Sequence, residues 1–292
     1  LTMPGEQVLV LSPVYNCFFS SIRNNGCQVL ECPLVYEDAT YHVDWEAFEA
    51  CCAQEKTTLL LLCNPHNPAG RVWTPEELAR MNGICLRHGV AVCSDEIHCE
   101  LVMPGSRFTP FAAVSAACRD NAVVLNSPSK SFNTAGLQIA NFVIHNPEWR
   151  RRVERAVNIN EVCDVNPFGP VALVAAYNEG EAWLDALCAY IKGNYDLVCD
   201  FFRGEVPAVK VVRLEGTYLA WLDVSGLAQP GSGGRLSEML AERLLAEARV
   251  KLSPGTLYGK KTGEGFLRLN LATQRSRLAE ALRRMAPVMR GV

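Results

Sequence analysis

The 292-residue sequence predicts an α/β fold with a mostly parallel sheet, followed by a smaller C-terminal α+β domain. In the first half, short continuous apolar runs alternate with helical stretches. Such runs are typical of parallel strands that are buried on both faces. Three polar motifs begin where apolar runs end, and ligands of these folds bind at the carboxyl ends of the strands. Hydrophobic residues make up 49% of the chain, which is enough for a sizeable core.

Six apolar runs of the first half are expected to be strands: 7–11, 28–32, 58–63, 90–94, 122–126 and 139–144. Helical stretches lie between them, near residues 16–25, 44–54 and 74–88. The last of these begins with a strong start signal. Thr74 can cap the helix, Pro75 suits its first turn, and Glu77 stands at the capping-box position.

The second half begins with a mainly helical region, residues 147–204. A smaller α+β unit follows, with expected strands near 209–213, 217–223 and 265–271, and expected helices at 236–248 and from Ser276 on. The glycine-rich stretch 231–234, within the loop 229–234, is expected to be a surface turn, with no P-loop lysine after it and no G-x-G-x-x-G pattern. We place the domain change near residue 180, so that residues 1–180 form the large domain and residues 181–292 the small one.

Composition argues against several classes of function. The net charge of −3 and the pI near 6 give no basic excess for nucleic acid or a membrane surface. No apolar run reaches the roughly 18 residues that span a bilayer, and residues 1–5 do not resemble a signal peptide. The 13 cysteines include no C-x-x-C pair, so we expect buried free thiols and a cytosolic protein.

Lys130 is the first candidate for covalent chemistry. It follows the apolar run 122–125 and lies among small side chains in Ser127-Pro128-Ser129-Lys130-Ser131. Its amine could form a Schiff base with a carbonyl cofactor, once desolvation and nearby cations lower its pKa. On spacing alone an ordinary surface lysine is the simpler interpretation, because short motifs match by chance. Two further motifs, residues 64–70 and 94–98, also start at strand ends, and this common placement predicts one shared site.

Taken together, the three motifs resemble those of the fold-type I pyridoxal-phosphate enzymes, the aspartate-aminotransferase superfamily. The run Asn64-Pro65-His66-Asn67-Pro68-Ala69-Gly70 is similar to its asparagine-proline-glycine turn, Asp95 to its strand-end aspartate and Lys130 to its Schiff-base lysine. Four segments resemble the narrower MalY/PatB branch of carbon–sulfur β-lyases, which are of the cystathionine β-lyase type: residues 95–98, 129–133, 218–223 and 263–270. The resemblance runs from about Pro4 to the C-terminus.

The resemblance implies pyridoxal 5'-phosphate as cofactor and a role for three of the motif residues. Lys130 would hold the cofactor and later move the substrate α-proton. Asp95 would face the pyridine nitrogen and keep it protonated, and its alternative is a structural strand-end aspartate. Asn67 would donate to the phenolic oxygen, and its alternative is a simple Asn-Pro turn.

Five further residues complete the implied site. His98 stands where many aminotransferases carry a tyrosine near the phenolic oxygen, although a lone histidine is more often structural. Tyr15 is similar to the aromatic residue that stacks on the pyridine ring, and a core tyrosine is its alternative. Ser127 and Ser129 would hydrogen-bond the phosphate. Arg268 lies inside an apolar strand and matches the arginine that binds the substrate α-carboxylate.

The sequence departs from the superfamily in three places. Gln138 stands where many members place an arginine on the phosphate, an arginine that the β-lyase branch also tends to lack, and residues 273–276 replace a cysteine-proline-arginine-serine run. Family members also carry roughly 80 to 100 further N-terminal residues, more than a usual terminal trim. That region supplies a substrate-side segment, a phosphate turn and a tyrosine for the neighbouring subunit. We therefore expect the sequence to be a fragment, or to have lost part of its site and to bind cofactor weakly.

The implied function is a pyridoxal-phosphate carbon–sulfur β-lyase. L-cystathionine or a related cysteine S-conjugate would give pyruvate, ammonia and a thiol. An aminotransferase is the alternative, because both activities share every residue named above. A non-catalytic cofactor-binding or protein-binding module is a third interpretation, which the missing N-terminal region keeps open. The expected partner is a small amino-acid substrate, and the resemblance implies a homodimer with contacts in residues 158–170.

Overall fold

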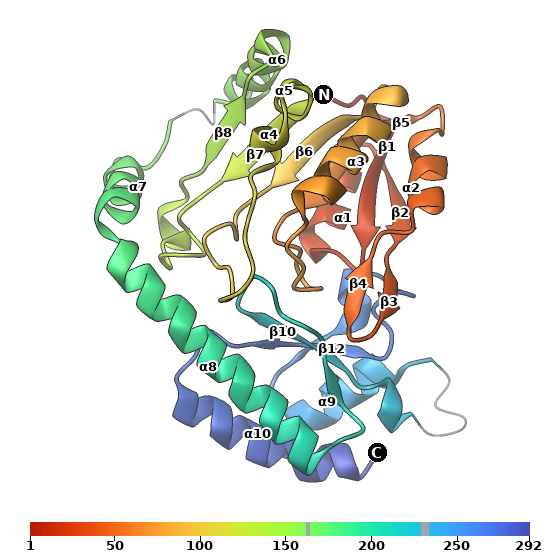
Figure 1. Ribbon diagram of the computed structural model, residues 1–292, viewed down its shortest axis with the longest axis vertical. Coiled ribbons are helices and arrows are strands. Elements are labelled where there is room, and N and C mark those ends of the chain that lie inside the picture. Colours follow the sequence, from red (N-terminus) through yellow and green to blue (C-terminus); the bar gives the residue numbers. More distant parts are fainter. Residues whose placement is uncertain (162–163, 229–233) are drawn as a thin grey trace.

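The large sheet lies at the centre of the first half of the chain (Figure 1). The computed structural model describes residues 1–161, 164–228 and 234–292. The sheet has the strand order β2-β1-β5-β6-β7-β8, in which β8 alone among the described strands of this sheet runs antiparallel to its neighbour. The bounds are β1 Gln7–Ser12, β2 Gln28–Pro33, β5 Thr57–Cys63, β6 Ala91–Asp95, β7 Ala122–Asn126 and β8 Asn141–Ile144. The predicted mostly parallel sheet is confirmed.

Helices cover both faces of this sheet, as the alternation of side chains along β1 shows. Leu9 and Leu11 belong to the core cluster that also contains residues of α2 (Trp45–Cys52) and α3 (Pro75–Arg87). Val8 and Val10 pack with residues of α1 (Asn16–Asn24) on the other face. The short helices α4 (Phe111–Val114) and α5 (Ala116–Asp120) join the first cluster, and α6 (Pro147–Asn158) follows β8.

The start of α3 has the capping box that the sequence predicts. The Thr74 hydroxyl accepts a hydrogen bond from the Glu77 backbone N–H, and the Glu77 carboxylate accepts one from the Thr74 N–H. These bonds satisfy donors that the first helical turn leaves free. The capping box therefore fixes where α3 begins, shortly after the loop 64–70 that carries Asn67.

A hairpin of β3 (Val35–Glu37) and β4 (Thr40–His42) was not predicted from the sequence. Each strand has three residues, which is too short for alternation to be recognised. The hairpin joins the two halves of the molecule, because the Tyr41 hydroxyl accepts a hydrogen bond of 3.0 Å from the Trp221 indole.

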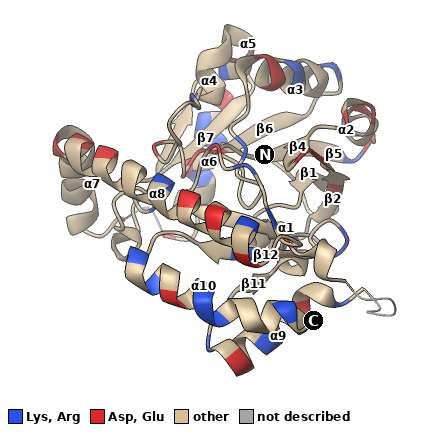
Figure 2. Cartoon of the chain, turned by 60° about the horizontal axis from the view of Figure 1, so that its bottom comes forward, with Lys and Arg blue, Asp and Glu red and all other residues tan. Residues whose placement is uncertain are grey.

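The C-terminal unit is the predicted α+β structure. Its antiparallel sheet has the order β11-β12-β10-β9, with β9 Lys210–Val211, β10 Leu219–Asp223, β11 Ser253–Pro254 and β12 Phe266–Asn270. Its helices are α8 Glu181–Glu205, α9 Leu236–Ala248 and α10 Arg275–Arg290, with short 3-10 helices at Ser225–Leu227 and Gly255–Tyr258. Before this unit lie α7 Phe168–Glu179 and, between β7 and β8, a short 3-10 helix at Ala135–Leu137. Figure 2 shows charged residues on the outer sides of α8, α9 and α10.

Two sequence expectations stay open in the C-terminal half. Of the glycine-rich turn expected at residues 231–234, residues 231–233 lie outside the described residues. The division of the chain at residue 180 also stays a prediction.

Within the ranges that the structure describes, no helix is long and apolar enough to cross a membrane.

Gly180, at the junction of α7 and α8, is expected to tolerate no side chain. A Cβ there would lie 2.4 Å from the Phe132 ring and 2.4 Å from the Ala176 carbonyl oxygen. We expect Gly180→Ala to lower the free energy of unfolding by about 1–3 kcal/mol, measured by urea unfolding. Gly204→Ala is the matched control, because no neighbouring atom lies within 4 Å of a Cβ at that position of α8. Equal effects of the two substitutions would contradict this account.

Candidate functional site

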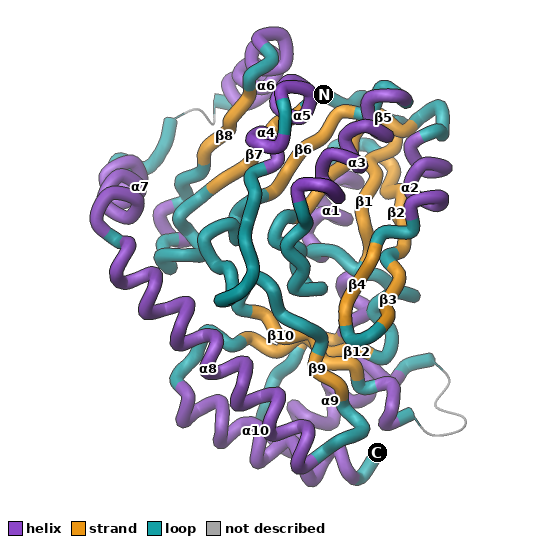
Figure 3. Tube along the Cα trace, in the orientation of Figure 1, coloured by secondary structure: helices purple, strands orange, loops and turns teal. Residues whose placement is uncertain are grey.

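The loops after β5, β6 and β7 meet between the large sheet and the small one (Figure 3). The loop after β5 is held by a buried histidine: the His66 ring contacts the Pro13 carbonyl at 2.8 Å and the Cys63 carbonyl at 3.2 Å. Burial lowers the pKa of His66 to about 4, so its ring is neutral near pH 7. The Gly70 N–H closes the loop on the His66 carbonyl at 2.7 Å. Asn67 is therefore presented by a loop that is fixed at both ends.

A cavity of about 300 Å³ lies at this meeting point. Seven of the eight predicted site residues line it, with only Ser127 outside its wall. The lining residues are Tyr15, Cys63, Asn67, Asp95, Ile97, His98, Ser129, Lys130, Tyr218, Leu219, Arg268 and Asn270. The chain thus brings side chains from both of its halves into one site.

Ser127 shapes the lysine turn. Its buried hydroxyl donates to the Ile139 carbonyl at 2.7 Å and accepts from the Ser129 N–H at 3.1 Å. Both interactions hold the chain just before Lys130. The expected contact of Ser127 with a phosphate stays a prediction.

Asp95 ends β6 as a mostly buried carboxyl group. Burial raises its pKa to about 6, while the Ile97 N–H at 3.2 Å and the charge of Lys130 act in the opposite direction. The carboxylate lies on the cavity wall, so a cation placed there would stabilise its charged form.

Asp95 is expected to make the cofactor-free protein less stable as pH rises from about 4 to 6. Across this range the unfolded state has lost the proton that the native state still holds, because the native pKa is the higher one. We expect the stability of the parent, relative to Asp95→Asn, to fall by about 1.4 kcal/mol per pH unit. Urea unfolding of both proteins across this range is the measurement. Asp38→Asn, in an exposed turn, is the control, and parallel curves for Asp95→Asn and the parent would contradict the expectation.

His98 supplies an unpartnered nitrogen in the site. Its side chain is 3% exposed, and Nδ1 has no hydrogen-bond partner among the described residues. Burial lowers the pKa of His98 to about 3, and the positive charges of Lys130 and Arg268 act in the same direction. The imidazole is therefore neutral, and a buried polar atom without a partner is costly. A polar ligand in the cavity would remove that cost.

Arg268 points from β12 toward the loop after β5. Its Nη1 donates to the Asn67 Oδ1 at 3.1 Å, and its guanidinium lies 4.6 Å from the centre of the Tyr258 ring. No carboxylate forms an ion pair with Arg268 in the part of the chain that the structure describes. The cation is held in place and remains open to an anion.

Five cavity residues were not predicted as site residues: the apolar Ile97 and Leu219, and three that carry polar groups. Tyr218 packs edge-on against His98 with ring centroids 5.5 Å apart, Asn270 ends β12, and Cys63 ends β5. The signal for Asn270 was its spacing, because residues two apart on a strand share a face and Arg268 is a predicted ligand. Cys63 stands at a strand end next to a predicted motif, and Tyr218 directly precedes a strand. A position at the end of a strand is therefore a signal for Cys63 and Tyr218, but a weaker one than the spacing of Asn270.

The sequence matches the family described as aminotransferase class I and II over residues 1–285. The chain belongs to this family. Among curated members, it is 40% identical over 284 residues to the cystathionine beta-lyase PatB of Bacillus subtilis, covering 97% of this chain and 72% of PatB. It is 33% identical over 289 residues to the protein MalY of Escherichia coli, covering 99% of this chain and 72% of MalY. The family membership and the narrower likeness agree with the resemblance seen in the motifs.

Solved structures of family members have the same fold. Cystalysin from Treponema denticola, whose structure contains pyridoxal 5'-phosphate, superposes with a TM-score of 0.94 at 33% identity, covering 99% of this chain and 72% of cystalysin. The pyridoxal-phosphate-bound C–S lyase from Staphylococcus hominis gives a TM-score of 0.88 at 30% identity, covering 98% of this chain and 72% of the lyase. These matches confirm the predicted fold class.

Proposed function

We propose that this chain is a pyridoxal 5'-phosphate-dependent carbon–sulfur β-lyase that converts L-cystathionine or a related cysteine S-conjugate to pyruvate, ammonia and a thiol. The relatives named above are cystathionine β-lyases and C–S lyases. The observation that carries the proposal is the cavity, which combines a lysine, a buried carboxyl group, a neutral histidine and an arginine open to an anion.

The residues of the cavity fit the cofactor. Lys130 offers a primary amine, Asp95 a carboxylate for the pyridine nitrogen, and His98 a nitrogen that has no partner in the described protein. The volume of about 300 Å³ suits a small ligand. When bound, the cofactor supplies an electron-accepting ring that stabilises negative charge on the substrate α-carbon.

The remaining side chains would orient the two ligands. Asn67 Oδ1 already accepts from Arg268, so the Asn67 amide nitrogen is the group that would donate to the cofactor. Tyr15 would lie against the ring, and Ser129 would donate to the phosphate. Ser127 would have to release the Ile139 carbonyl before its hydroxyl could donate there as well. Arg268 would pair with the substrate α-carboxylate through two parallel hydrogen bonds.

Lys130 would carry the proton chemistry. With the substrate joined to the cofactor, the free amine of Lys130 would take the proton from the substrate α-carbon. The bond between the β-carbon and sulfur then breaks, and the sulfur leaves with the electron pair as a thiolate. The ammonium of Lys130 can return its proton to that sulfur, and water completes the conversion to pyruvate and ammonia. Thiolates are good leaving groups, so proton removal and carbanion stabilisation are the main demands.

Pyruvate release tests the proposal. The chain is incubated with pyridoxal phosphate and L-cystathionine, without any keto acid. We expect pyruvate and ammonia in equal amounts, and D-cystathionine is the control. Absence of pyruvate, with glutamate formed once 2-oxoglutarate is added, would replace the lyase with an aminotransferase.

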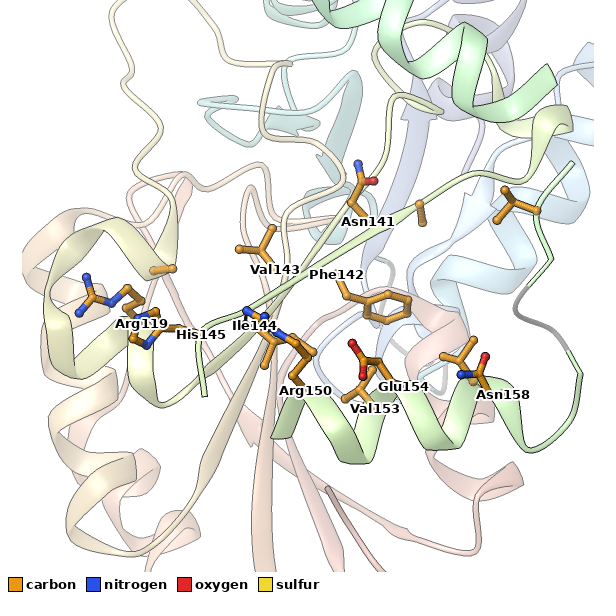
Figure 4. A pocket seen from close by; sticks show the side chains of 14 residues that line it. Arg119, Asn141, Phe142, Val143, Ile144, His145, Arg150, Val153, Glu154 and Asn158 are labelled. Atoms are coloured by element: carbon orange, nitrogen blue, oxygen red, sulfur yellow. Dashed lines mark hydrogen bonds between the residues drawn. The ribbon is translucent and has the colours of Figure 1, made fainter. Parts of the chain in front are cut away.

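We further propose that the chain forms a homodimer through the face of β8 and α6. A groove of about 910 Å³ lies between these elements, where Phe142 points toward α6 (Figure 4). Phe142 is 52% exposed and Phe168 is 70% exposed, and apolar surface of this kind marks interaction sites. The expected contact segment 158–170 adjoins this groove, although residues 162 and 163 lie outside the described structure. Sedimentation velocity, with Phe168→Glu expected to shift the chain to monomer, tests the proposal.

We also propose a cytosolic location. It is supported by the twelve cysteines among the described residues, all of which are free thiols.

A further inference from the structure

Two turns carry the candidate catalytic groups, and they follow neighbouring strands. The first, which we call the histidine turn, is residues 96–100 after β6, and the second, the lysine turn, is residues 127–133 after β7. Asp95 and Leu125 are paired in the parallel ladder, and the Glu96 N–H donates to the Leu125 carbonyl at 2.9 Å. This bond fixes the bases of the two turns, but Lys130 lies five residues beyond Leu125.

Lys130 lies between two serines that are both hydrogen-bonded. On one side, the Ser129 N–H donates within the lysine turn to the Ser127 hydroxyl. On the other side, the fully buried Ser131 hydroxyl donates to the Glu100 carboxylate at 2.6 Å. This second bond crosses from the lysine turn to the histidine turn. A hydroxyl-to-carboxylate bond of this length belongs to the stronger class of hydrogen bonds.

Glu100 is itself held by the helices that follow the lysine turn. The Cys188 thiol of α8 donates to the Glu100 carbonyl at 3.6 Å. The Tyr177 hydroxyl of α7 donates to Asn126 Oδ1 at 2.6 Å, just before the lysine turn. Burial and then the nearby charge of Glu100 raise the pKa of Tyr177. Phe132, two residues after Lys130, packs edge-on against Tyr177 at 6.0 Å. Glu100 therefore lies where the histidine turn, the lysine turn and α7–α8 meet.

We infer that Glu100 is a positioning residue, which through Ser131 sets the place of Lys130 relative to Asp95 and His98. The inference rests on the proposed function, in which Lys130 holds the cofactor that Asp95 and His98 also contact. Glu100 does not line the cavity, so it acts on the cofactor only through Lys130. A small displacement of a reacting group lowers the reaction rate by a large factor. The bond between Ser131 and Glu100 would prevent such a displacement of Lys130.

The rate at which pyridoxal phosphate attaches to Lys130 tests this inference. Samples are quenched with borohydride at timed intervals, digested, and the labelled Lys130 peptide is quantified by mass spectrometry. We expect Glu100→Ala to slow labelling by about 10- to 100-fold. Glu100→Gln should stay within about threefold of the parent, because its amide oxygen can still accept from Ser131. Urea unfolding of the cofactor-free proteins is measured alongside, since a merely structural residue would lower stability without changing the labelling rate.

Two further substitutions make the result decisive. Ser131→Ala removes only one hydroxyl and should slow labelling as Glu100→Ala does, and the double variant should be no slower than Glu100→Ala. Glu238→Ala is the control, because it removes a similar bond of 2.5 Å to Thr256 outside both turns and should label like the parent. Normal labelling of Glu100→Ala would overturn the inference about Glu100, and so would labelling of Glu100→Gln that is as slow as that of Glu100→Ala. Neither result would affect the proposed role of Lys130. A parent protein labelled at some other lysine would overturn the role of Lys130 itself, and the inference with it.

Discussion

Replacing Lys130 with alanine is expected to reduce pyruvate release from L-cystathionine by at least about 1,000-fold. The substitution removes the amine that would hold the cofactor and the base that would take the α-proton. The measurement is the initial rate of pyruvate formation at saturating pyridoxal phosphate. Lys130→Arg should be equally inactive, because it keeps the positive charge while arginine stays protonated and cannot serve as nucleophile or base.

The Lys130 prediction has a direct control. Lys210 is exposed on β9 and belongs to the small sheet, so Lys210→Ala should keep the parent rate. If Lys130→Ala retained pyruvate formation within about threefold of the parent, the assignment of Lys130 as base and cofactor ligand would be wrong.

Replacing Arg268 with lysine is expected to lower kcat/KM for S-methyl-L-cysteine by roughly 100-fold, or about 3 kcal/mol. Lysine keeps the charge but loses the two parallel hydrogen bonds to the α-carboxylate. It also loses the bond to Asn67 Oδ1 and the contact with the Tyr258 ring, which hold the guanidinium in place. The measurement is pyruvate formation across a range of substrate concentrations.

The methyl ester of the same substrate separates carboxylate binding from general damage. The parent should prefer the free acid strongly, and Arg268→Lys should lose most of that preference. Arg213→Ala, whose side chain is 71% exposed, should behave like the parent. An Arg268→Lys variant that still preferred the free acid to the same extent would show that another group binds the carboxylate.

Strands and the site's position in the large sheet could be predicted from the sequence because both depend on local signals. The continuous apolar runs of β1, β5, β6 and β7 are strong signals for buried strands. Because parallel strands end at the same edge, residues at three strand ends were expected to meet. Asn67, Asp95 and Lys130 do line one cavity.

Other features depend on contacts between residues that are distant in sequence. Arg268 and Asn67 are 201 positions apart, and Tyr41 and Trp221 are 180 apart. No spacing rule pairs such residues. The place of Arg268 inside an apolar strand marked it as unusual, but only the family resemblance implied its role. The β3–β4 hairpin is too short to give a periodic signal, and Tyr41 joins it to the small sheet through the Trp221 indole. The bond of Ser127 to Ile139 likewise appears only once the turn has folded.

The most direct test of this account is to locate the cofactor on the chain. The protein is incubated with pyridoxal phosphate, reduced with borohydride and digested, and the labelled peptides are identified by mass spectrometry. The account predicts label on Lys130, with the label lost in Lys130→Arg. Label that falls mainly on another lysine, or that persists unchanged in Lys130→Arg, would contradict it.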